Sequence, residues 1–186
     1  MHSERLKADA ELAEKKYLYE RALADWERKT ELAENVLAGF YKARAIFKAA
    51  RHPFSTGNEG SSREKPDDEK PSQTSRKNAI YAPYERLKKE IDFFTDLTAS
   101  RYRFSALFGA EGDEPFSRIV SAFNEVQNAT FALLADDLSP SESREMGLQA
   151  AIGWVRSEDD KIAAAIDQAV AEIERLCRPI LLSQPR

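Results

Sequence analysis

Apolar residues recur every three or four positions from Glu4 to Arg51, a spacing that places them along one face of a helix. Proline is absent from this stretch, and Gly39 is its only glycine. The positions on this line are Leu12, Lys16, Tyr19, Leu23, Trp26, Thr30, Ala33, Leu37, Phe40, Arg44 and Phe47. We therefore predict one helix of about 48 residues, spanning about 72 Å. Pro53 ends it, because the residue before a proline is disfavoured in the α conformation.

The apolar face of this helix is narrow before Trp26 and wide after Val36. We expect residues 1–29 to form a projecting or coiled-coil arm, and residues 30–182 to form a helical bundle. Residues 54–78 interrupt the bundle, since they contain Gly, Ser, Pro and mixed charges with almost nothing apolar to bury. This segment is expected to be a mobile linker.

The rest of the chain has further helical periods and no strand-like alternation. Pro83 fits the first turn of the next helix, where a missing N–H is tolerated. Ser157 either caps a new helix or lies on the surface of a continuous one, and Pro179 is expected to end the last helix. The predicted helices cover 79–108, 115–137, 139 to about 155, and 157–179. The fold class predicted from this pattern is all-α, an antiparallel up-and-down bundle of four to five helices with a very long first helix.

Composition narrows the possible roles of such a bundle. The chain has 186 residues, of which 42% are hydrophobic and 32% charged, and its formal net charge is −4. An acidic balance argues against binding nucleic acid through phosphate contacts. No apolar run is long enough to span a membrane, no apolar signal core is present, and one cysteine cannot form an internal disulfide. We expect a cytoplasmic protein, or the soluble portion of an anchored one.

Candidate catalytic and metal-binding groups are few. The only histidines are His2 and His52, and neither lies three residues after a glutamate, as a di-iron bundle requires. Cys177 falls on the apolar side of the last helix, which is typical of a small core residue. No nucleophile–base pair and no cofactor motif is present in the sequence. The sequence therefore favours a protein that is not an enzyme and has no cofactor.

A basic stretch before the linker provides one candidate site. No acidic residue occurs between Asn35 and Asn58, and a loop rich in glycine and hydroxyl groups follows directly. Together they could hold a small anion through cations and backbone N–H groups. The alternative is structural, because cations are favourable at any helix C-terminus. The candidate anion-binding residues are Arg44, Lys48, Arg51, Ser55, Thr56, Gly57, Gly60 and Arg63.

Two arginines on the apolar stripes, Arg44 and Arg101, need partners if they are buried. Pairing the first two helices antiparallel predicts Glu90 as the partner of Arg44. The same pairing predicts Glu34 or Glu27 as the partner of Arg101.

The arm provides the second candidate site. Its charged residues of both signs surround a thin apolar stripe, as in a two-stranded coiled coil or at the edge of a bundle. The candidate interface residues are Leu12, Tyr19, Leu23 and Trp26. Left unpaired, this stripe would be unusual, so it should meet the last helix or another chain. The favoured interpretation is an interaction module that self-associates or binds a protein partner through the first helix. The alternative is a bundle that senses a small anionic ligand.

Overall fold

The computed structural model describes residues 2–135, 142–154 and 160–184, and its regular structure is entirely helical. This confirms the predicted all-α class. The α-helices are α1 (His2–Ala50), α2 (Pro71–Lys89), α3 (Ile91–Phe108), α4 (Asp113–Leu134), α5 (Glu142–Ala151) and α6 (Lys161–Leu181). A short 3₁₀ turn, η1 (Ala110–Gly112), joins α3 to α4. None of the helices in the described ranges is long and apolar enough to cross a membrane.

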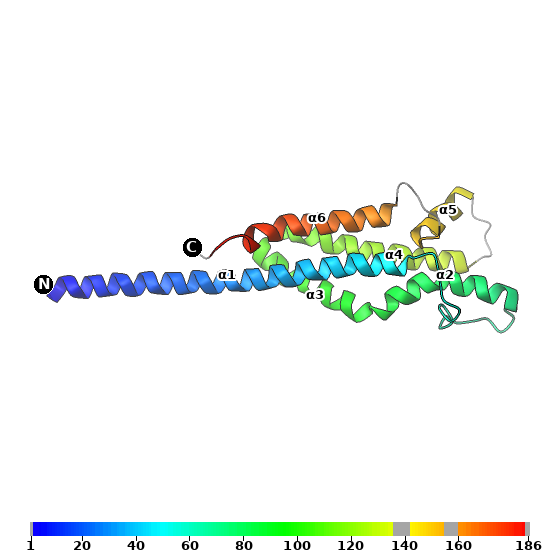
Figure 1. The fold of residues 1–186 in the computed structure, drawn as a ribbon, viewed down its shortest axis with the longest axis horizontal. Helices are drawn as coiled ribbons and strands as arrows, with labels where there is room; N and C mark the ends of the chain where they lie inside the picture. The colour runs from blue at the N-terminus through cyan, green and yellow to red at the C-terminus, as the bar shows by residue number, and fades with distance from the viewer. Residues whose placement is uncertain (1, 136–141, 155–159, 185–186) are drawn as a thin grey trace.

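The long first helix is present, and it has 49 residues. Apart from Leu32, its buried apolar positions advance by alternating steps of three and four: Ala33, Val36, Phe40, Ala43, Phe47 and Ala50. Such steps keep one side chain per turn facing the same neighbours, so this half of α1 enters the core. Figure 1 shows the other half extending past the helical body as a single unaccompanied rod, the arm.

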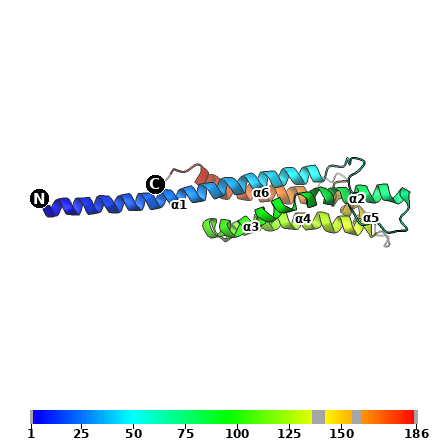
Figure 2. The same cartoon turned by 90° about the horizontal axis from the view of Figure 1, so that it is seen from below.

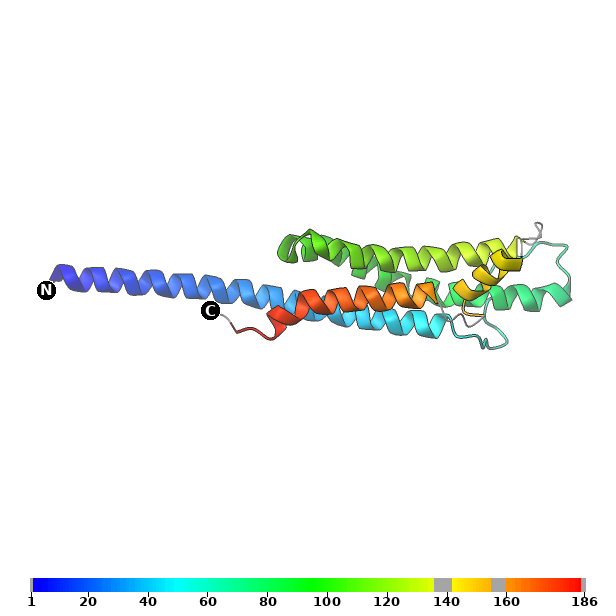
Figure 3. The ribbon, with the colours of Figure 1, turned by 90° about the horizontal axis from the view of Figure 1, so that it is seen from above.

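The body consists of four columns of helix arranged around this core. α1 packs against α6 on one side and against α2 and α3 on the other, and α4 completes the square by packing against α6, α2 and α3. Figures 2 and 3 show these columns from opposite sides, with α6 lying along the second half of α1. The ring of Phe116 on α4 meets that of Phe40 on α1 edge to face, at 5.0 Å between centroids. Such contacts between facing columns fill the interior.

The helix expected at 79–108 differs from the observed one in two ways. It begins earlier, at Pro71, so Pro83 lies inside α2 and is buried there instead of in a first turn. It is also broken at Glu90, whose φ of −100° and ψ of 16° separate α2 from α3. With this break, the described ranges contain six α-helices instead of the four to five helices expected. The break allows α3 to follow α1 closely at Gly39, where an added Cβ would lie 2.8 Å from Leu97 Cδ1.

The C-terminal part also differs from its prediction. Residues 155–159, which include the expected cap Ser157, lie outside the described residues. The cap of α6 is Asp160, whose carboxylate accepts the N–H of Ala163 at 3.0 Å. Pro179 does not end α6, which continues to Leu181. Near a C-terminus a proline removes only one internal hydrogen bond, and the apolar face of α6 extends past it.

Candidate functional site

The arm is the most exposed part of the described chain. Every residue from Glu4 to Arg21 is exposed, whereas Leu23 and Trp26 are partly buried. The exposed residues include five large apolar side chains, Leu6, Leu12, Tyr17, Leu18 and Tyr19, all more than half exposed. Where such side chains align along one side of an unaccompanied helix, they form a surface that monomers rarely leave uncovered.

The body meets the arm near Trp26. The indole Nε1 of Trp26 donates a hydrogen bond to Ser183 Oγ at 3.1 Å, just after the end of α6. The structure therefore divides the four candidate interface residues into two pairs. Leu23 and Trp26 lie where the body ends, while Leu12 and Tyr19 remain open.

Leu12 and Tyr19 continue the line of the core. They precede Trp26 by fourteen and seven residues, and the same spacing leads on to the buried Ala33 and Phe40. Seven residues are nearly two helical turns, so these side chains follow one slowly rotating stripe along α1. The exposed stripe is thus an extension of the surface that the body covers elsewhere.

Leu6 and Tyr17 belong to a different side of the arm. They lie eleven residues apart, close to three turns, and share a side with Ala10 and Ala13. The predicted interface residues do not include this second line. The spacing of eleven residues is the signal that would have revealed it.

The structure brings three of the predicted anion-binding residues together, and the others lie in the loop after α1. Arg44, Lys48 and Arg51 line a cleft of about 1000 Å³ between the end of α1 and the start of α6. Arg44 lies on the α6 side of α1, half exposed, with its guanidinium 3.6 Å from the Asp167 carboxylate. Its expected partner Glu90 was wrong, because α6 and not α2 covers this side of α1. Lys48 is exposed, as are the loop residues Ser55, Thr56 and Gly57.

Arg51 and Arg63 have structural partners in different places. Arg51 joins three elements, because its guanidinium donates to the carbonyl oxygens of Ala150 and Ala151 and to the carboxylate of Asp160. Arg63 is buried and forms an ion pair with Glu69. Both cations therefore already have anionic or carbonyl acceptors.

The loop between α1 and α2 does bind an anion, which is the chain's own Glu85. The buried carboxylate of Glu85 accepts the backbone N–H of Gly60 at 2.9 Å and the hydroxyl of Ser62 at 2.5 Å. Burial acts to raise the pKa of Glu85, but the hydrogen bonds from Gly60 and Ser62, together with the nearby charge of Lys89, outweigh it and the pKa is lowered. Glu85 is absent from the predicted site residues, and its signal in the sequence is its place four residues after the buried Tyr81, on the same face of α2.

Further contacts hold this loop against α2. Arg63 donates to Asn78 Oδ1 at 2.8 Å, and its ion pair lowers the pKa of Glu69 to about 2. Gly60 has a φ of 75°, and a Cβ there would lie 1.9 Å from the carbonyl oxygen of Asn78. The expected linker 54–78 therefore ends at Lys70, and the loop 54–70 has specific partners. Its mobility stays a prediction.

The expected partners of Arg101 were also wrong. The guanidinium Nε of Arg101 lies 3.0 Å from Asp113 Oδ1, at the start of α4, and Ser105 donates to the same carboxylate oxygen. These hydrogen bonds lower the pKa of Asp113. The tight turn at η1 brings α4 beside the end of α3, so the partner comes from the next helix and not from α1.

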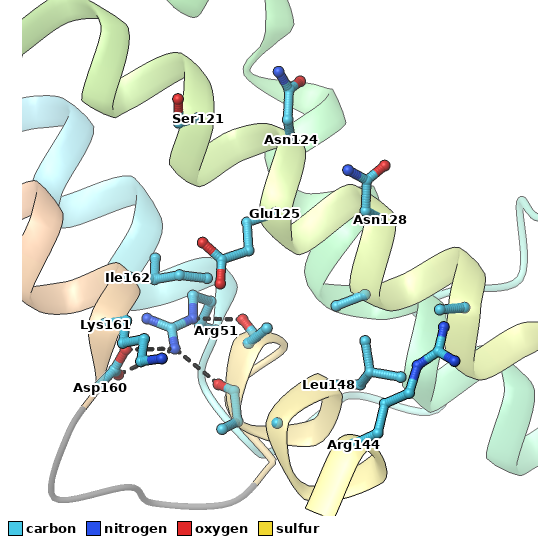
Figure 4. Close-up of a pocket in the computed structure, with 15 residues that line it drawn as sticks. Arg51, Ser121, Asn124, Glu125, Asn128, Arg144, Leu148, Asp160, Lys161 and Ile162 are labelled. Carbon is cyan, nitrogen blue, oxygen red and sulfur yellow. Dashed lines mark hydrogen bonds and ion pairs between the residues drawn. The ribbon is translucent and has the colours of Figure 1, made fainter. Parts of the chain in front are cut away.

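A cleft of about 790 Å³ lies between α4, α5 and the start of α6 (Figure 4). Glu125 points into it from α4, while the guanidinium of Arg51 on its far side is bonded to Ala150, Ala151 and Asp160. No cysteine or histidine lies among the residues that line it. Across the described ranges, no three His, Cys, Asp or Glu side chains come together as a metal site.

Comparisons with known proteins give no match to this chain, whether with models of protein families, with curated proteins or with solved structures.

Proposed function

We propose that this chain is a non-enzymatic interaction module, and that the arm of α1 binds another protein chain, its own or a different one. The observation that carries the proposal is the continuous exposure of residues 4–21 together with their five large apolar side chains. An isolated helix of this length is marginal in water, so a partner that covers its apolar side chains would stabilise it.

In this proposal the body is an antiparallel up-and-down bundle that serves as a rigid base. Two contacts support opposite directions for α1 and α6: Arg51, after the end of α1, binds Asp160 at the start of α6, and Trp26 binds Ser183 after its end. A solid base fixes the direction in which the arm leaves the body, and preorganisation of this kind reduces the entropy that binding must overcome.

Photo-crosslinking of the full chain in its native host tests the proposal. A photoreactive phenylalanine analogue replaces Tyr19 on the arm and, as a matched control, Tyr102 on α3, since both tyrosines are more than half exposed. We expect a product of discrete mass from position 19 and none from position 102. A product from position 102 alone, or none from either, would contradict the proposal.

A second pair of variants identifies the side of the arm that binds. Leu12→Gln on the stripe should reduce the crosslinked product from position 19 by about tenfold, because the leucine's apolar surface is lost from the interface. Leu6→Gln lies on the other side of the arm and should leave the product unchanged. The reverse result would move the interface to the side of Leu6 and Tyr17.

The alternative function, sensing of a small anion, rests on the loop 54–70. Its support is that Gly60 and Ser62 already bind a carboxylate, that of Glu85. For this role, an added anion would have to displace Glu85. A rise in melting temperature with phosphate that is larger in Glu85→Gln than in the wild-type chain would favour it.

A further inference from the structure

The charges of the exposed arm are divided along its length. Residues 4–14 carry four acids and two bases, a net charge of −2: Glu4, Asp9, Glu11 and Glu14 against Arg5 and Lys7. Residues 15–21 carry three bases and one acid, a net charge of +2: Lys15, Lys16 and Arg21 against Glu20. The arm is neutral as a whole but is polarised from its tip to its base.

This polarity distinguishes the two ways in which two arms can pair. Parallel pairing would place like-charged halves beside each other. Antiparallel pairing places the acidic outer half of each arm, residues 4–14, beside the basic inner half of the other, residues 15–21. Flanking charges of this kind set orientation in helix pairs, since juxtaposed like charges are unfavourable and opposite charges favourable.

The shape of the molecule agrees with antiparallel pairing. All of the body lies at one end of the arm (Figure 1). Two antiparallel arms would overlap over residues 4–21 and hold their bodies at opposite ends, without a clash. Leu12 lies near the middle of this range, so the two copies of Leu12 would meet close to the two-fold axis, a self-complementary arrangement.

We propose that the partner of the arm is a second copy of this chain, paired antiparallel along the stripe of Leu12 and Tyr19. This inference rests on the proposed function and specifies its partner. Three features would recognise the partner: the acidic outer half of the arm, its basic inner half, and the thin apolar stripe that runs along both. Because Lys16 interrupts that stripe, the dimer is weak and forms at micromolar or higher concentrations.

A charge swap tests the pairing with the full chain, by sedimentation equilibrium at about 100 µM protein and low salt, where surface charges are least screened. Lys15→Glu/Lys16→Glu makes both halves acidic, and Glu11→Lys/Glu14→Lys makes both halves basic. Each double variant should weaken the dimer by roughly tenfold or more. The quadruple variant exchanges the two signs and should restore it. Circular dichroism at matched concentrations checks that all variants keep their helix content.

Spin labels measure the orientation directly. A single cysteine at Ala13 or Ala24 carries the label, while the native Cys177 is buried, and burial raises the pKa of its thiol to about 11, so it does not react at neutral pH. In the antiparallel dimer, labels at position 13 lie near the two-fold axis, and those at 24 lie about 30 Å further apart. In a parallel pair the two distances would be similar.

The outcomes separate this inference from the proposed function. A wild-type dimer, rescue by the quadruple variant and unequal label distances support antiparallel pairing. Equal distances, or a monomer at 100 µM, overturn it. If the purified chain is a monomer while position 19 still crosslinks to a different protein, the proposed function stands and the second copy is not the partner. If neither occurs, both fail.

Discussion

The two halves of α1 belong to one continuous helix but differ in the width of their apolar face and in their surroundings. In the core half, one apolar side chain faces inward at every step from Ala33 to Ala50, and none of these positions is charged. In the arm, the same spacing passes through Ala22, Tyr19, Lys15 and Leu12, so this line contains a charged residue. A helix can continue with so thin a stripe when it is joined to a packed body. A helix can therefore remain continuous over residues whose apolar face no neighbouring helix covers.

The largest difference between the halves should appear on truncating one side chain in each. Phe40 is fully buried, with its ring against Phe116, so Phe40→Ala should lower the free energy of unfolding by about 3–5 kcal/mol. Leu12→Ala should change it by less than about 0.5 kcal/mol at concentrations where the chain is monomeric. Urea denaturation followed by circular dichroism measures both, and comparable losses would show that the arm is part of the packed core.

A smaller effect is expected where the loop 54–70 meets the body. Glu85→Ala leaves the buried N–H of Gly60 without its acceptor, which should cost about 1–3 kcal/mol. Asp92→Ala, on an exposed carboxylate of α3, is the matched control and should stay within about 0.5 kcal/mol. Equal stabilities of the two variants would mean that the loop does not depend on Glu85.

The smallest effect is expected from mild acid, which protonates the carboxylates that hold the loop 54–70. Down to about pH 4 this protonation should reduce the stability only slightly. The folded-state pKa of Glu69 is about 2, below its ordinary value of 4.5, and the pKa of Glu85 is lowered too. Groups with lowered pKa values stabilise the fold above their ordinary pKa, and this stability is lost as the pH falls from about 4.5 towards 2. Protease cleavage within residues 54–70 should therefore accelerate below pH 4, equally in the Leu12→Gln variant. Acceleration that depended on Leu12 would place the sensitive contacts in the arm.

Local periodicity predicted the presence of the helices well. Proline and glycine predicted the ends of the helices less well. The line from Leu12 to Phe47 identified α1 because a spacing of three and four is a property of the segment itself. Pro53 marked its end correctly. Pro83 and Pro179 misled the prediction because the packing of α2 and α6 tolerates a proline inside each helix. No glycine or proline marks the break between α2 and α3 at Glu90. The path of α3 along α1 requires this break.

Partners across the fold were not predictable from the sequence. The partner of Arg44 depends on which helix covers that side of α1, and the periodicity of one helix does not identify its neighbours. The contact of Glu85 with Gly60 joins residues 25 apart, through a loop whose composition indicates only a lack of core residues. The exposed stripe at Leu12 and Tyr19 was predictable, because its narrowness is visible in the sequence itself.

The unbroken passage of α1 from the arm into the core has a mechanical consequence. Residues 2–50 form one helix with no kink, and helices of this kind bend only gently. The arm is therefore a stiff lever whose axis is fixed by Phe40 and the aromatic contacts around it. A partner bound near Leu12, as proposed, would be held at a set direction from the body. Any tilt imposed on the arm is transmitted as torque to the α1–α6 contact, with the bond between Trp26 and Ser183 nearest the point of rotation.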